Sequence, residues 1–383
     1  MARYYFDYAA ATPLDPDAAR AMHEAEVLVG NPASLHAVGR AARSLLDRAR
    51  KDIARVLNAR ETEIVFTSTA TEADNLAIFG VVTASGEEQA EVLVAPTEHA
   101  AVRRVTDVVR ASGFACKDLP LTEHGLCDVA ALEKMITDKT ILITIGYVTS
   151  EVGIIQPVGE IAKLVRKLRE TRVARGITTP LILHTDASAA AGLLTLGVDR
   201  LGVDLMTLSS PKVYGPHGAA ALYVRSGTPL TPHTIGGGQE RGLRAGTENV
   251  PAIVGFAAAL TKAERMRKDE LKRLEPLRDE LWSKLRVMNG IRRNGDRNQL
   301  ANTLNVSIAD QDGEDLVLRL DALGFAVATG AACAESSREP SQVLLGLGYD
   351  EARAQSSLRI TLGRDTTEAA VSALAKAIKK VVQ

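Results

Sequence analysis

The chain of 383 residues contains only three cysteines, Cys116, Cys127 and Cys333, and no C-x-x-C pair. This scarcity excludes a disulfide framework and a cysteine-ligated zinc site, and we expect no metal centre. Few cysteines and no pairing are typical of a reducing compartment, so we expect a cytoplasmic protein. Cys116 and Cys127 have the surroundings of ordinary packing residues, which leaves Cys333 to be tested for reactivity.

The sequence also lacks an excess of charge of either sign and any long apolar run. Its 46 Lys and Arg residues and 47 Asp and Glu residues give a net charge of -1. This balance gives no electrostatic basis for binding nucleic acid or an anionic membrane surface. No apolar stretch approaches the ~20 residues that a membrane span needs, and the first residues do not form a signal peptide. We therefore expect a soluble globular protein.

From residue 62 the chain alternates strand-like and helix-like segments. Such alternation predicts an α/β fold with a mainly parallel sheet covered by helices on both faces. A strong amphipathic helix is expected over 37–57, before the first of these strands. Further amphipathic stretches at 102–112 and 159–173 lie between several of the strands. The seven expected strands are 63–67, 92–96, 115–119, 141–148, 181–186, 205–209 and 219–224.

The pattern changes after Gly236, Gly237 and Gly238. A long charged helix is expected over 251–287, followed by shorter strands at 302–308, 325–329 and 357–362 and helices at 313–323, 340–347 and 366–382. We predict a large domain over 15–250 and a smaller α/β domain formed by 1–14 together with 251–383.

Polar clusters follow several of the expected strands of the large sheet. In parallel sheets ligands bind beyond the carboxyl ends of the strands, so these clusters should meet at one edge. They occupy 67–71, 97–99, 149–151, 184–188 and 209–212.

Lys212 is the candidate nucleophile among these clusters. The buried strand 205–209 leads into Ser210, Pro211 and Lys212. A lysine held against low-dielectric protein loses hydration, which lowers the pKa of its amine and makes it reactive towards an aldehyde. The alternative is a surface lysine just past a strand end.

Three further features complete a recognisable set. The segment around Ala70 and Thr71 follows a strand and opens a helix, so its backbone amides suit a phosphate, although a plain N-cap with Glu72 and Asp74 in the first turn fits equally well. Asp186 is either an N-cap or the partner of a protonated pyridine nitrogen, and His99 offers a flat ring. Lysine, carboxylate, ring and phosphate cup are together what pyridoxal 5'-phosphate requires.

Arg359, Asn31 and Cys333 are candidates on the substrate side. Arg359 lies in mid-strand, where its planar fork suits a substrate carboxylate or a structural ion pair. Asn31, in a Gly-Asn-Pro loop, offers an amide to a ligand or merely connects two helices. Cys333 stands among small residues and turn formers, which favours an exposed, mobile segment and a reactive thiol.

These motifs give the chain a family resemblance that runs nearly end to end. It resembles the pyridoxal-phosphate cysteine desulfurases of the NifS/IscS-like group, in the class V aminotransferase branch of fold type I. The matching motifs are Tyr5–Pro13, Gly30–Ser34, Ala70-Thr71-Glu72, Asp74-Asn75, Thr97-Glu98-His99, Lys212–Pro216, Gly236–Gly238, Glu240-Arg241-Gly242, Gly246-Thr247, Asn305-Val306-Ser307, Ala332-Cys333, Glu339-Pro340-Ser341 and Leu358–Gly363.

The resemblance implies a role for each matched position. Lys212 corresponds to the lysine that binds the cofactor covalently, Asp186 to the pyridinium partner and His99 to the stacking histidine that moves protons. Cys333 corresponds to the cysteine that takes the substrate sulfur as a persulfide and leaves alanine. The remaining matches are Ala70, Thr71 and Ser209 in the phosphate cup, Thr247 reaching across a homodimer interface, and Arg359 and Asn31 at the substrate carboxylate. Ser150 occupies a further substrate-binding position of the family.

The implied reaction is the conversion of L-cysteine to L-alanine, with sulfur passed to an acceptor or scaffold protein for iron–sulfur cluster, thio-cofactor or tRNA biosynthesis. The sequence departs from the family pattern at Ala189, where a glutamine is usual, at Ser150 in place of asparagine, at Pro211 in place of histidine and at Thr69 in place of glycine. These departures leave open a related C–S or C–Se lyase or an aminotransferase. A catalytically inactive binding partner is a third alternative.

Overall fold

The computed structural model describes residues 4–28, 30–87, 89–295, 298–330 and 340–382. Seven strands form one sheet in the order β2-β8-β7-β6-β5-β3-β4. Only β8 runs antiparallel to its neighbours, so the predicted mainly parallel sheet is confirmed. The strands are β2 (Ile64–Thr67), β3 (Glu91–Val94), β4 (Ala115–Asp118), β5 (Thr140–Thr144), β6 (Ile182–Asp186), β7 (Leu205–Ser209) and β8 (Ala220–Val224).

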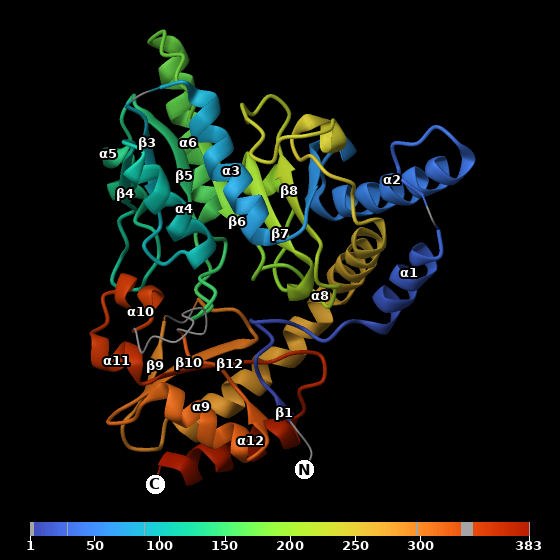
Figure 1. Cartoon of the computed structure of the whole chain (residues 1–383). Coiled ribbons are helices and arrows are strands. Elements are labelled where there is room, and N and C mark those ends of the chain that lie inside the picture. The colour runs from blue at the N-terminus through green and yellow to red at the C-terminus, as the bar shows by residue number, and fades with distance from the viewer. Residues whose placement is uncertain (1–3, 29, 88, 296–297, 331–339, 383) are drawn as a thin grey trace.

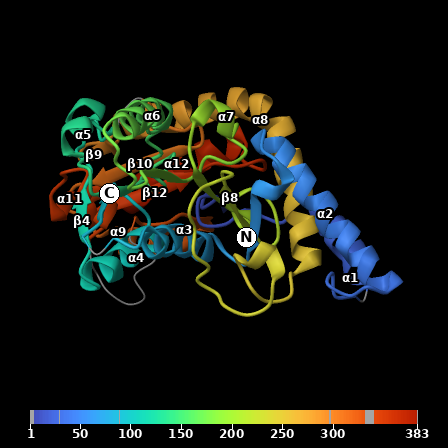
Figure 2. The ribbon, with the colours of Figure 1, turned by 90° about the horizontal axis from the view of Figure 1, so that it is seen from above.

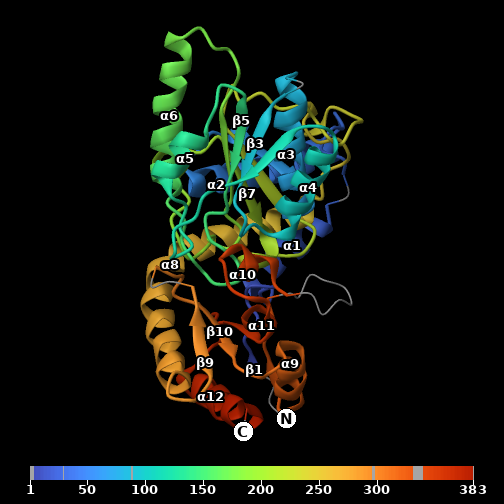
Figure 3. The ribbon, with the colours of Figure 1, turned by 90° about the vertical axis from the view of Figure 1, so that its left-hand side faces the viewer.

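Helices cover both faces of this sheet. Figures 2 and 3 show α3 (Ala70–Ser85) and α4 (Ala100–Ala111) on one face, with α5 (Val129–Met135) and α6 (Val158–Ala174) on the other. The strands between them are mostly apolar and almost entirely buried, apart from the edge strand β4. A strand covered on both faces favours such residues, and buried polar side chains such as His184 are hydrogen-bonded to neighbouring strands.

Two helices at the N-terminal end pack against the long helix α8 (Val250–Leu285). The first, α1 (Pro16–Glu26), begins at the N-cap Asp15. The second, α2 (Ala37–Leu57), has the bounds that the sequence predicts. His36 caps its N-terminus, and Asn58 ends it in a left-handed conformation with φ of 51°, which asparagine tolerates better than most residues.

A smaller α/β part lies below the large sheet in Figure 1. It contains the antiparallel sheet β12-β10-β9 and the parallel pair β1-β11. The strand β9 and the helix α11 were not expected from the sequence. The elements are β1 (Tyr4–Tyr5), β9 (Ile291–Asn294), β10 (Thr303–Ile308), α9 (Gly313–Ala322), β11 (Phe325–Ala326), α10 (Gln342–Gly346), α11 (Glu351–Gln355), β12 (Ser357–Thr361) and α12 (Glu368–Val382).

The helix α8 runs diagonally between the two parts (Figure 1). Its first half contributes Phe256 and Leu260 to the core under the large sheet, and its second half contributes Leu277 and Leu281 to the core of the smaller part. The predicted domain boundaries, 15–250 against 1–14 with 251–383, stay a prediction. Within the described residues, no helix combines the length and apolarity that a membrane crossing requires.

Candidate active site

The predicted site residues gather at the carboxyl edge of the large sheet. Asp186 ends β6, Lys212 closes the short 3-10 turn η2 (Ser210–Lys212) after β7, and His99 is the N-cap of α4. Burial lowers the pKa of His99, and the charges of Asp186, Lys212 and Arg359 act on the same imidazole. The structure therefore brings together four side chains that lie far apart in the sequence.

Lys212 is half-buried and held against the N-terminal segment of the chain. Its Nζ donates hydrogen bonds to the carbonyl oxygens of Ala9 and, at 2.8 Å, Ala10. The same segment is fixed by Thr12, whose backbone N–H donates to the carbonyl of Pro211 at 2.8 Å and whose Oγ1 accepts from the N–H of Tyr214 at 2.6 Å. The fully buried strand β7 therefore places Lys212 against the N-terminal segment rather than at an open surface.

The N-terminus of α3 presents Ala70 and Thr71 in its first turn. Thr69 is the N-cap, and its Oγ1 accepts from the N–H of Glu72 at 3.1 Å. Arg244 joins this end of the helix: its Nε donates to Glu72 Oε1 and its Nη2 to Ser68 Oγ, both at 2.7 Å. A guanidinium beside a helix N-terminus increases its attraction for an anion.

The role of Arg244 was not predicted from the sequence. The only signal was an arginine within the glycine-rich stretch 236–246.

A fully buried polar group lies beneath Asp186, on the same strand. His184 has its Nδ1 2.8 Å from Thr144 Oγ1 and its Nε2 3.1 Å from Thr207 Oγ1. Burial lowers the pKa of His184 to about 4, so this imidazole is neutral at pH 7. Asp74, on α3, faces the same histidine, and burial raises the pKa of its carboxyl well above the usual range.

The N-cap interpretation of this helix start holds for Thr69 and Glu72 but not for Asp74, which lies beyond the first turn with its side chain fully buried. Glu98 is a second buried carboxyl near Asp186. It accepts a hydrogen bond from the N–H of Gly146, and burial raises its pKa to about 7.

Arg359, at the centre of β12, is 8% exposed. Its Nη2 pairs with Asp7 Oδ1 at 3.0 Å. Its Nε is buried and, among the described residues, has no hydrogen-bond partner. The structural ion pair that the sequence left open therefore exists, and it engages Nη2 but not Nε.

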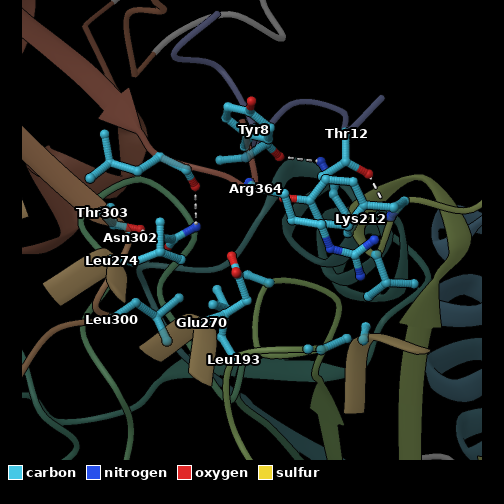
Figure 4. A pocket seen from close by; sticks show the side chains of 18 of the residues that line it. Tyr8, Thr12, Leu193, Lys212, Glu270, Leu274, Leu300, Asn302, Thr303 and Arg364 are labelled. Carbon is cyan, nitrogen blue, oxygen red and sulfur yellow. Dashed lines mark hydrogen bonds between the residues drawn. The ribbon is translucent and has the colours of Figure 1, made fainter. Parts of the chain in front are cut away.

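Two of the departures from the family pattern, Ser150 and Ala189, line one cavity with Lys212. Its volume is about 60 Å³. Figure 4 shows Glu270, Asn302 and Arg364 around the same space, with apolar side chains such as Leu274 and Leu300. The two short side chains face this space beside Lys212.

The remaining predicted residues are not joined to this group by the described contacts. Asn31 lies between α1 and α2, and its Oδ1 accepts from the N–H of Ala33 at 2.9 Å. Thr247 is exposed between η3 (Gln239–Gly242) and α8. Cys333 lies outside the described residues. Cys127 is buried, which raises the pKa of its thiol to about 12 and is consistent with a packing role.

The donors at this edge fit pyridoxal 5'-phosphate. A helix N-terminus with an adjacent arginine suits the phosphate, and a carboxylate at the end of β6 suits a pyridinium. The amine of Lys212 and the ring of His99 supply the remaining two requirements. The described residues contain no cluster of three or more His, Cys, Asp or Glu residues that would hold a metal ion.

The fold and this edge of the sheet define an α/β enzyme of fold type I. The chain belongs to the class-V aminotransferase family, whose model matches residues 4–374.

Curated relatives match along almost the whole chain. Cysteine desulfurase IscS 1 of Archaeoglobus fulgidus is 36% identical over 382 residues, covering 99% of this chain and 97% of the relative. Cysteine desulfurase IscS of Pectobacterium carotovorum is 40% identical over 385 residues, covering 99% and 92%.

Solved structures agree with these sequence matches. A NifS-like protein superposes with a TM-score of 0.90 at 33% identity, covering 99% of both chains. SspA in complex with cysteine superposes with a TM-score of 0.80 at 32% identity, covering 94% of this chain and 98% of that one.

Proposed function

We propose that the protein is a pyridoxal 5'-phosphate-dependent cysteine desulfurase, which converts L-cysteine to L-alanine and transfers the sulfur to Cys333. The observation that carries the proposal is the meeting of Lys212, Asp186, His99 and Arg359 at one edge of the sheet. Full-length relatives named cysteine desulfurase and a similar structure holding cysteine support it.

The proposal assigns the cofactor to these residues. Lys212 would bind it covalently, Asp186 would pair with the pyridine nitrogen and His99 would stack on the ring. Ala70, Thr71 and Ser209, at the N-terminus of α3 and the end of β7, would hold the phosphate. When bound, pyridoxal phosphate supplies an electron sink for the bonds at the substrate Cα.

The protein's own residues then bind substrate and move protons. Arg359 pairs with the substrate carboxylate. Ser150, beside Lys212, and Asn31, in the loop between α1 and α2, are proposed as further substrate-binding residues. The lowered pKa of His99 keeps its imidazole neutral at pH 7, so it can accept a proton. The amine of Lys212 is the second group available to move the proton at Cα.

The sulfur step balances without an external oxidant. The thiolate of Cys333 attacks the substrate sulfur, the S–S bond of a persulfide forms and the substrate C–S bond breaks. The electron pair of that bond stays on the substrate carbon, which takes up a proton and leaves as alanine. A nucleophilic thiolate is the form of cysteine that this step requires.

The proposal also covers the oligomeric state, the sulfur acceptor and the roles of the two domains. We propose a cytoplasmic homodimer in which Thr247 reaches the partner's cofactor site, and a protein that accepts the sulfur from Cys333. The large domain over 15–250 would bind the cofactor, and 1–14 with 251–383 would carry the cysteine segment.

The direct test is product analysis with purified enzyme, pyridoxal phosphate and L-cysteine. We expect alanine without any added keto acid, and one persulfide on Cys333 when no reductant is present. Cys333→Ala should form no persulfide and little alanine. The proposal fails if wild type forms no alanine or if Cys333→Ala equals it. A requirement for a keto acid would instead indicate an aminotransferase.

A further inference from the structure

Glu151 makes a buried contact between the active-site edge and the smaller part of the molecule. It follows Ser150 in the segment after β5, and its side chain reaches α10. The hydroxyl of Ser341 donates to Glu151 Oε2 at 2.5 Å, and the same oxygen of Ser341 accepts from the N–H of Leu344 at 3.1 Å as the N-cap of α10. Glu151 is 9% exposed and Ser341 3%.

Gly330 lies close to both Glu151 and Ser341. A Cβ at position 330 would lie 2.3 Å from Glu151 Oε2 and 2.9 Å from the Cβ of Ser341. At such distances a side chain at position 330 would displace Glu151 or Ser341. Gly330, Glu151 and Ser341 therefore meet in one place. Gly330 precedes the segment 331–339 that contains Cys333, and Ser341 follows it after Pro340.

The same contact is tied to Arg359. Asn305 donates from Nδ2 to the carbonyl of Glu151 at 3.1 Å and pairs with Arg359 across β10 and β12. Ala328, two residues before Gly330, exchanges backbone hydrogen bonds of 2.7 and 3.2 Å with Arg359. Burial raises the pKa of Glu151 to about 7, while the charge of Arg359 and the Ser341 hydroxyl lower it.

A buried carboxyl at this position lowers the stability of the fold unless other groups compensate for its burial. Burying it requires compensation, and the Ser341 hydroxyl is its one side-chain hydrogen-bond donor among the described contacts. Glu151 lies between Arg359 and the residues that flank the segment 331–339, and a role beyond packing explains this position better.

We propose that Glu151 is a positioning residue that fixes both ends of the Cys333 segment relative to Arg359 through its contacts with Ser341 and Gly330. The inference rests on the proposed function for the role of Cys333. By holding Gly330 and Ser341 together, Glu151 fixes where the segment leaves and re-enters the fold. Misplacing a reacting group by about 1 Å costs on the order of 100-fold in rate.

The first test needs no catalytic activity. In the cofactor-loaded resting enzyme, the alkylation rate of Cys333 by iodoacetamide is measured by peptide mass spectrometry. We expect Glu151→Ala and Ser341→Ala each to raise this rate several-fold, and the double variant to raise it no further than either single one. Glu151→Gln and Ser341→Thr keep an acceptor and a donor, so both should restore wild-type rates.

Ser372→Ala is the matched control. It removes a hydroxyl that donates to Glu280 Oε1 at 3.2 Å, between α12 and α8. We expect it to leave Cys333 alkylation unchanged. Unchanged alkylation in Glu151→Ala, or additive effects in the double variant, would overturn the proposal.

The second test is single-turnover alanine formation. Glu151→Ala and Ser341→Ala should slow it by about tenfold or more, while the change in cofactor absorbance on adding L-cysteine, which does not need Cys333, stays at the wild-type rate. A slowed absorbance change equal to the loss in alanine would also overturn the proposal. If wild type itself forms no alanine, the proposed function fails, and the alkylation cycle still decides the role of Glu151.

Discussion

His184 Nε2 lies 3.6 Å from Asp74 Oδ1, and both side chains are fully buried beneath Asp186. Burial is the largest cause that raises the pKa of Asp74, followed by the charge of Asp186. Burial likewise keeps His184 neutral. The folded protein therefore holds a proton on Asp74 that the unfolded chain releases above about pH 4.

Asp74→Asn should consequently change how stability depends on pH. Between the unfolded pKa and the raised folded pKa, the native state binds the extra proton, so wild-type stability falls as pH rises. Asparagine carries no such proton. The unfolding free energy of the variant minus that of wild type should therefore grow as the pH rises above the unfolded pKa, with a limiting slope of about 1.4 kcal/mol per pH unit.

The measurement is urea unfolding at several pH values. Glu98 and His184 titrate in both proteins and cancel in the difference. Asp269→Asn, at an exposed position on α8, is the control and should show no pH-dependent difference. A constant difference for Asp74→Asn would mean that Asp74 is ionised in the folded state.

Ala189→Gln tests the cavity beside Lys212. The cavity has space for the larger side chain, so we expect a stability loss within about 1 kcal/mol. The new amide would lie beside the bound cofactor and should shift the absorbance at about 420 nm. The neighbouring Ala190 is fully buried in the core. Ala190→Gln should cost about 1–3 kcal/mol or more by overpacking. Equal losses of thermal stability in the two variants would show that a glutamine at position 189 does not fit into the cavity.

Arg359→Lys should mainly weaken substrate binding. Lysine keeps the charge but loses the planar fork, and a hydrogen bond to a charged group is worth roughly 1.5–3 kcal/mol. Steady-state kinetics should show KM for L-cysteine raised about 10- to 100-fold, with a smaller change in kcat. Arg353→Lys is the control. The guanidinium carbon of Arg353 lies 3.7 Å from the ring centroid of Tyr349, outside the site. Equal KM values in wild type and Arg359→Lys would show that Arg359 does not bind the substrate.

Glu240→Ala should destabilise the fold strongly. Glu240 accepts bonds of 2.6 and 2.7 Å from Arg50 and one of 2.8 Å from the N–H of Phe66. Removing it leaves a buried, uncompensated guanidinium, which costs about 3–5 kcal/mol. Asp47→Ala breaks the exposed pair with Arg43 and should cost at most about 1 kcal/mol in the same urea titration. Similar losses in both would contradict the prediction.

Local patterns were sufficient to predict most of the fold. The helix 37–57 has an apolar stripe and residues that cap both ends, and the strands of the large sheet are short apolar runs. The strand β9, Ile291–Asn294, escaped detection because its two central residues are arginines. The helix α11 has only five residues, too few to show a helical period.

The site was predictable where residues follow strands and unpredictable where they meet across elements. Lys212, Asp186 and His99 all follow or end strands of one parallel sheet, so topology alone places them at one edge. Asp74 meets His184 across a helix–sheet interface, and Glu151 meets Ser341 across two parts of the fold. Those pairs depend on tertiary packing, which spacing along the chain does not encode.

The shared helix α8 has a consequence for cooperativity. Because one continuous helix supplies buried side chains to two hydrophobic cores, neither core can lose its structure without exposing apolar surface of α8 that adjoins the other. Heating should therefore melt the two cores in a single calorimetric transition, and a chain break within α8 should split that transition in two.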